Sequence, residues 1–130
     1  MIVVDASALY EVLTAGRVAP AVRGRLHVEP DQCAPAFVDA EVMSVLRRDV
    51  LRGVLDDTAG ALAVEDLRDW PGDRIPHQPF LNRVWELRSR VRSWDAFYVA
   101  LAEAMECPLL TLDRRLARVR GLECSIEVLQ

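Results

Sequence analysis

The pattern of apolar and polar positions begins with a strand and passes directly into a helix. Residues 2–4 are Ile, Val and Val, a run that is typical of a short strand buried on both faces. Asp5 follows at the end of this run. Beyond it, apolar residues recur at helical spacing, at Ala8, Leu9, Val12 and Leu13. Asp5 therefore lies in a predicted turn between a strand and a helix.

The alternation of strand and helix continues to the C-terminus. Short apolar runs predict further strands at residues 32–36, 74–77, 109–112 and 125–129. Helical spacing predicts helices at residues 19–26, 37–53, 56–70, 80–90 and 114–120. One more helix is expected to begin with Ser93 as its cap and to end at Pro108. Gly53 is expected to close the helix at residues 37–53. This alternation predicts an α/β fold with a parallel sheet of about five strands, in a single domain spanning residues 1–130.

Composition narrows the class of protein. The net charge of −4 disfavours binding to nucleic acid through bulk electrostatics, although all 16 basic residues are arginine, which suits bidentate recognition of phosphate. Three cysteines without a C-x-x-C pair are typical of buried thiols in a reducing cytosol. The two histidines lie far apart, which argues against zinc. We expect a soluble, cytoplasmic protein with no signal peptide and no membrane span.

Four acidic residues occupy positions that carry chemistry. Asp5 and Asp113 each follow a predicted strand, while Asp95 and Glu41 lie near the beginnings of helices. If the first and fourth strands are neighbours, these acids meet at the carboxyl edge, where open α/β sheets bind ligands. Gathered carboxylates repel one another, which raises the pKa of at least one of them, and Mg²⁺ or Mn²⁺ would relieve the repulsion. Water on such a cation is a candidate nucleophile toward a phosphodiester.

Each acid also has a purely structural interpretation. Asp5, Asp95 and Asp113 all stand where a carboxylate favours the N-terminus of a helix. Glu41 has a rival in Asp39, because both flank the apolar stripe and helical periodicity does not decide between them. Three arginines near the C-terminus either steer RNA phosphates toward the cation or form an ordinary solvated face, and these are Arg114, Arg115 and Arg118.

Three segments together resemble the PIN-domain family. They are the opening IVVDAS, an Ala-Glu-Val followed by Leu-Arg-Arg in the second segment, and SWDAFYVALAEAMECPLLTLDRRLA. The resemblance covers the whole chain and is strongest to the VapC-type toxins of bacterial toxin–antitoxin pairs. It implies a PIN-like three-layer fold and RNA cleavage with Mg²⁺ or Mn²⁺. It also implies the residues that bind the metal and carry catalysis, which are Asp5, Glu41, Asp95 and Asp113.

The resemblance has further implications for the site and its partners. It selects Glu41 over Asp39, and it places polar neighbours of the site at Ser7 and Thr111. It implies an RNA substrate, a homodimer, and a cognate antitoxin whose C-terminal part covers the active site. The chain departs from the family pattern at Trp94, where tyrosine is more common before the aspartate. This departure concerns the fit of the substrate rather than the metal.

Other classes of protein with acidic sites fit less well. A receiver domain needs a second acid beside the first and an active-site lysine, but Ala6 follows Asp5 and the chain has no lysine. A haloacid-dehalogenase-like phosphatase needs an aspartate where Ser7 stands. No glycine-rich phosphate loop is present. A PIN-like domain that only binds protein or RNA, without catalysis, is the remaining alternative, and a neighbouring gene for a small DNA-binding antitoxin would favour the toxin instead.

Overall fold

The sheet of this protein is fully parallel. A computed structural model describes residues 1–130. Its strand order is β3-β2-β1-β4-β5, with every neighbouring pair parallel. The strands are β1 (Ile2–Val4), β2 (Gln32–Pro35), β3 (Asp73–Ile75), β4 (Leu109–Thr111) and β5 (Ile126–Val128). The predicted sheet is therefore confirmed, as is the adjacency of the first and fourth strands, in which Val3 pairs with Leu109.

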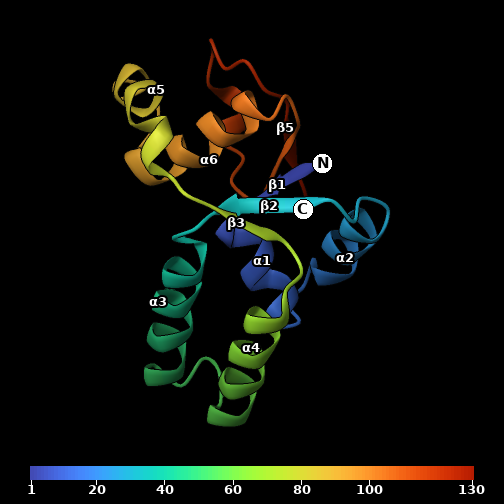
Figure 1. Cartoon of the computed structure of the whole chain (residues 1–130). Helices are drawn as coiled ribbons and strands as arrows, with labels where there is room; N and C mark the ends of the chain where they lie inside the picture. The colour runs from blue at the N-terminus through green and yellow to red at the C-terminus, as the bar shows by residue number, and fades with distance from the viewer.

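Helices cover both faces of this sheet and give a three-layer α/β architecture. In Figure 1, α1 to α4 lie on one side of the strands, while α5 and α6 lie on the other. The helices are α1 (Ala6–Leu13), α2 (Ala19–His27), α3 (Val38–Leu51), α4 (Asp57–Asp69), α5 (Leu81–Glu86) and α6 (Ser93–Ala104). Two short 3₁₀ turns, η1 (Gln78–Phe80) and η2 (Leu116–Arg118), complete the chain. None of these helices has the length and apolarity needed to cross a membrane.

The core is a continuous cluster of 28 buried apolar residues that joins the three layers. All three residues of β1 are fully buried, as expected for a central strand covered by helices on both faces. Helix α6 contributes an almost continuous buried run from Tyr98 to Ala102. These packed elements fix the ends of β1 and β4, where the first and last of the candidate acids are expected.

The predicted end of α3 is confirmed. Gly53 has a φ of +74°, the left-handed conformation that glycine adopts without steric cost. The Val54 amide then donates to the carbonyl of Asp49 at 2.9 Å, so a free carbonyl at the end of the helix is satisfied. The helix itself is two residues shorter than the predicted range 37–53 at its C-terminal end.

The predicted cap of α6 is wrong by one residue. Ser93 is the first residue of the helix and makes no capping bond; Arg92 holds the extended N-cap conformation instead, with φ −62° and ψ 147°. The helix also ends at Ala104, three residues before the predicted limit, because Glu106 adopts a positive φ and turns the chain toward β4. Asp95 is still in the first turn, as predicted.

Two other predicted helices are much shorter in the structure. The range 80–90 contains only the last residue of η1 and the helix α5, because the chain leaves the helix after Glu86 to bury Leu87 and Val91 in the core. The range 114–120 contains only the single turn η2. This turn begins where the Asp113 side chain accepts the Arg115 amide at 2.9 Å.

Candidate functional site

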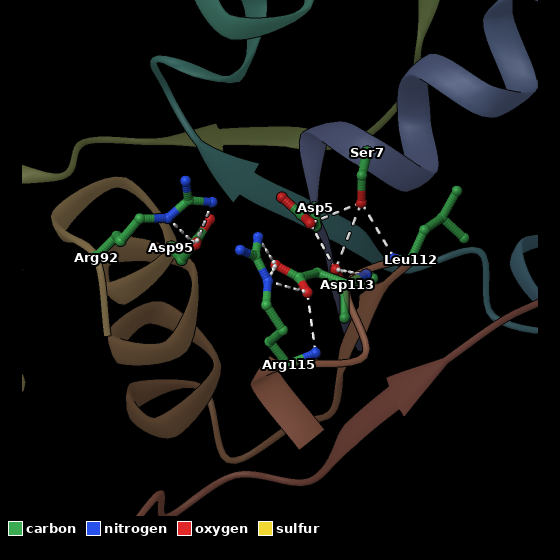
Figure 2. A network of polar contacts seen from close by, with 8 residues as sticks. Asp5, Ser7, Arg92, Asp95, Leu112, Asp113 and Arg115 are labelled. Carbon is green, nitrogen blue, oxygen red and sulfur yellow. Dashed lines mark hydrogen bonds and ion pairs between the residues drawn. The ribbon is translucent and has the colours of Figure 1, made fainter. Parts of the chain in front are cut away.

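Asp5 is held by two hydroxyl groups at the carboxyl end of β1. Its Oδ2 accepts hydrogen bonds from Ser7 Oγ at 2.7 Å and from Thr111 Oγ1 at 2.6 Å. The same hydroxyls accept the amides of Leu112 and Asp113, so the network ties β1 to the end of β4 (Figure 2). Both hydroxyls donate to one oxygen, which leaves Oδ1 without a side-chain donor. The residue is 7 % exposed, and burial raises the pKa of the Asp5 carboxyl.

Glu41 lies near Asp5 and projects from the first turns of α3. We use the name acidic centre for Asp5, Glu41, Asp95 and Asp113 together. Its Oε1 is buried and has no hydrogen-bond partner, and the hydroxyl of Tyr98 is buried without a partner as well. Burial and the nearby charge of Asp5 raise the pKa of Glu41 to about 7, although the closeness of Tyr98 works in the opposite direction. A buried carboxylate oxygen without a donor carries a desolvation cost that a ligand would relieve.

Asp95 and Asp113 complete the predicted set, and each is paired with an arginine. Arg115 grips Asp113 through its guanidinium, with contacts of 3.0 Å to Oδ1 and 2.8 Å to Oδ2. Arg92 contacts Asp95 Oδ2 at 3.3 Å through two nitrogens. Figure 2 shows both guanidinium groups on the side that faces Asp5. The Arg115 hydrogen bonds hold the pKa of Asp113 below its ordinary value.

The structure brings Asp5, Glu41 and Asp95 within electrostatic range of one another, and Asp113 shares a cavity with Asp95. The charge of Asp95 contributes to the raised pKa of both Asp5 and Glu41. Asp95 and Asp113 line a small cavity of about 150 Å³, and Glu41 and Asp95 line a larger one of about 500 Å³. The repulsion expected from the sequence therefore adds to burial in raising the pKa of Asp5 and Glu41. The pKa of Asp113 is lowered instead, because Arg115 donates hydrogen bonds to it.

The donor set fits a hard divalent cation. Carboxylate oxygens are the ligands that Mg²⁺ and Mn²⁺ prefer, and both Asp5 Oδ1 and Glu41 Oε1 lack a side-chain donor. No three carboxylate, histidine or cysteine side chains converge tightly enough to form a ready-made cage. Mg²⁺ does not need one, because it keeps several of its waters and binds through one or two carboxylates.

Asp39, the rival of Glu41, lies outside this centre. It forms a two-pronged ion pair with Arg74, with contacts of 3.0 and 3.2 Å, on the side of α3 that faces α4. Arg74 also donates to the carbonyls of Leu67 and Trp70, so the pair fastens β3 to the end of α4. Asp39 thus has a structural partner of its own, whereas Glu41 has none.

The residues around the four acids include some that the sequence pattern does not indicate. Arg92 contacts Asp95, and Tyr98 lies near Glu41. The sequence signal that could have indicated Arg92 is a basic residue three positions before Asp95. Of the three C-terminal arginines, only Arg115 pairs with Asp113. Arg114 donates to Gln130, and the Arg118 side chain makes no ion pair.

Trp94, the departure from the family pattern, stands at the mouth of the larger cavity. It is 61 % exposed, and its ring meets Phe37 edge to face at 5.0 Å. Phe37 in turn contacts His77, Phe97 and Tyr98, so the indole is supported by a packed aromatic cluster. An exposed ring therefore flanks the cavity that Glu41 and Asp95 line.

Comparison with known proteins agrees with this architecture. The sequence model of the PIN domain matches residues 2–122. The ribonuclease VapC12 of Mycobacterium tuberculosis is 40 % identical over 98 % of this chain and 98 % of its own length. The ribonuclease VapC1 of the same organism is 42 % identical over 98 % and 97 %.

A solved structure shares the fold. The crystal structure of PAE2754 from Pyrobaculum aerophilum superposes with a TM-score of 0.68 at 24 % identity, over 98 % of this chain and 83 % of that one. The parallel order β3-β2-β1-β4-β5, the acids at its carboxyl edge and the near full-length sequence matches agree. On these grounds, the chain belongs to the PIN-domain family, and within it to the VapC proteins.

Proposed function

We propose that this protein is a Mg²⁺- or Mn²⁺-dependent endoribonuclease and the toxin of a type II toxin–antitoxin system. In this proposal it cleaves cellular RNA in the cytoplasm and thereby inhibits translation and growth. The observation that carries the proposal is the acidic centre, in which the buried Glu41 Oε1 has no donor and the pKa of both Asp5 and Glu41 is raised. The relatives named as VapC ribonucleases support the same activity.

The chain's own residues have distinct roles in this proposal. Asp5, Glu41, Asp95 and Asp113 would hold the cation. When bound, the cation supplies an activated water and positive charge beside the transferring phosphate. Ser7 and Thr111 orient Asp5 by donating to Oδ2, which keeps Oδ1 available. Because these hydroxyls are themselves tied to the amides after β4, the Asp5 carboxylate is fixed before substrate binds.

The alternative is a PIN-like module that binds protein or RNA without catalysis. Such a module has no use for a buried and a half-buried carboxylate with raised pKa, which cost stability in the absence of a cation. This cost favours the enzyme. The proposal also includes a homodimer and a cognate antitoxin that covers the site, both on the grounds of the VapC relatives.

The proposal is tested by incubating the purified protein with RNA in Mg²⁺, in Mn²⁺ and in excess chelator. We expect cleavage in either metal and none in chelator. Expression in cells with and without the adjacent small gene, followed by mapping of the RNA ends, tests the toxin role. Equal cleavage with chelator present would exclude a metal-dependent nuclease, and unimpaired growth without the adjacent gene would exclude a toxin.

Trp94 gives a prediction about the substrate. An exposed aromatic ring beside an RNA-cleaving site offers a platform on which an unpaired base stacks, worth about 1–3 kcal/mol per base. We expect Trp94→Ala to weaken binding of single-stranded RNA by about fivefold or more. Trp85 is 67 % exposed but does not line the cavity, so Trp85→Ala is the matched control. Equal affinity of both variants in fluorescence anisotropy would rule out stacking on Trp94.

A further inference from the structure

Arg115 is bound to Asp113 far more extensively than an ordinary surface arginine. Its Nε lies 3.0 Å from Oδ1 and 3.3 Å from Oδ2, its terminal nitrogen lies 2.8 Å from Oδ2, and its own amide donates to Oδ1 at 2.9 Å. The side chain is nevertheless 71 % exposed. The amide bond belongs to the turn that begins η2, but an exposed ion pair adds little to the stability of the fold, so folding alone does not account for the guanidinium contacts.

Arg92 occupies a position that helix energetics disfavour. It is the N-cap residue of α6, where Ser, Thr, Asn and Asp are preferred and where the helix dipole repels a positive charge. It makes no capping bond and instead directs its guanidinium to Asp95. Its side chain is 72 % exposed. Arg92 therefore does not stabilise α6 as a cap, and its favourable interaction is the one with Asp95 in the acidic centre.

The two arginines lie on the same side of the centre. Both line the cavity of about 150 Å³ together with Asp95 and Asp113, and in Figure 2 both guanidinium groups lie to the left of Asp5, on the Asp95 side. A guanidinium stays charged at every relevant pH, and its fork matches a phosphate as well as it matches a carboxylate. In the free protein, the guanidinium groups of Arg92 and Arg115 thus supply positive charge next to the acids.

We propose that Arg92 and Arg115 are exchangeable counter-ions of the acidic centre. Without a divalent cation they neutralise Asp95 and Asp113; when the cation binds, they release these carboxylates and bind backbone phosphates of the RNA. This inference rests on the proposed function, since it assigns the metal and RNA to the same site. It predicts effects of opposite sign, because each arginine competes with the cation and assists the substrate.

The test uses Arg115→Gln and Arg92→Gln in the full-length protein, with two binding measurements that do not depend on cleavage. Titration calorimetry with Mn²⁺ in the absence of RNA should show affinity about threefold to tenfold higher than in the wild type. Anisotropy with single-stranded RNA in Ca²⁺, with the RNA verified intact on a gel, should show affinity lower by a similar factor. The salt dependence of RNA binding should fall by about one charge per arginine.

Arg118→Gln is the matched control, because it removes the same charge from the same segment but breaks no ion pair. It should leave Mn²⁺ affinity unchanged. Arg115→Lys retains the charge without the fork and should fall between Arg115→Gln and the wild type, which guards against a loss of fold. Mn²⁺ affinity that is unchanged or lower in Arg115→Gln would overturn the inference, as would RNA affinity that does not fall.

Failure of the proposed function gives a different result. A wild type that binds Mn²⁺ and cleaves RNA, with arginine variants that behave like it, refutes only the exchange. Arginine variants that show the two opposed shifts, beside a wild type that never cleaves RNA, refute only the nuclease. Circular dichroism melts of each variant in chelator establish that the compared proteins are folded.

Discussion

Asp5→Asn is expected to lower RNA cleavage by about 100-fold or more while leaving the fold intact. The substitution keeps the shape of the side chain and an oxygen that accepts from Ser7 and Thr111. It removes the negative charge at the residue most deeply placed in the centre, which is 7 % exposed. Cleavage rates in Mn²⁺, measured together with circular dichroism, check the prediction.

The stability of this variant separates a lost charge from a lost structure. Burial raises the pKa of Asp5, so at neutral pH the unfolded chain gives up this proton more readily than the fold does, and the carboxyl is a cost to the metal-free fold. The metal-free Asp5→Asn protein should therefore melt at or above the wild-type temperature, as neutralised functional sites often do. Asp39→Asn changes charge by the same amount on the far side of α3 and should keep full activity. Full activity in Asp5→Asn would remove this residue from the proposed mechanism.

Much of the fold is predictable because its signals are local and agree with one another. The β-branched run of β1 and the left-handed Gly53 each specify one conformation of the backbone. The errors arise where tertiary packing overrides local preference. Ser93 is a better cap than Arg92 in isolation, but Arg92 holds the cap conformation in the structure. Residues 87–91 have helical spacing, but in the folded chain the burial of Leu87 and Val91 decides instead.

The candidate site is predictable to a lesser degree. Position after a strand identifies Asp5 and Asp113, since strand ends are visible in the sequence. Periodicity alone does not separate Glu41 from Asp39, because the difference lies in what each side chain meets across the molecule: Arg74 for Asp39 and buried space for Glu41. The pairing of Arg115 with Asp113 also depends on a turn that the sequence does not reveal, since the local spacing predicts a helix there.

Glu41→Gln is expected to abolish cleavage and growth inhibition, whereas Asp39→Asn should retain both. The glutamine would keep the volume of the side chain but remove the only charge that α3 contributes to the centre. Asp39→Asn weakens the half-exposed pair with Arg74, which costs about 1 kcal/mol of stability. RNA cleavage in Mn²⁺ and plating of cells that express each variant give the comparison. An inactive Asp39→Asn beside an active Glu41→Gln would mean that the helix presents its other face.

The same pair of variants tests the electrostatics of the metal-free protein. The folded pKa of Glu41 is about 7, against an ordinary value of 4.5. Below pH 4.5 the group is protonated in both folded and unfolded states and costs nothing. As the pH rises toward 7, the unfolded chain ionises first, so the free energy of unfolding falls; above about 7 the full cost is present. With allowance for the partial exposure of the side chain, this cost is about 2 kcal/mol.

Glu41→Gln lacks this titration, so its melting temperature in chelator should match the wild type near pH 4.5 and exceed it increasingly up to about pH 7.5. Mn²⁺ should then reverse the order at about pH 7.5, because a cation that binds only the native state stabilises the wild type and has lost a ligand in the variant. Asp39→Asn should follow the wild-type curve in both conditions. A constant difference between Glu41→Gln and the wild type across this pH range would show that the pKa of Glu41 is not raised in the folded protein, and that its carboxylate already has a partner without metal.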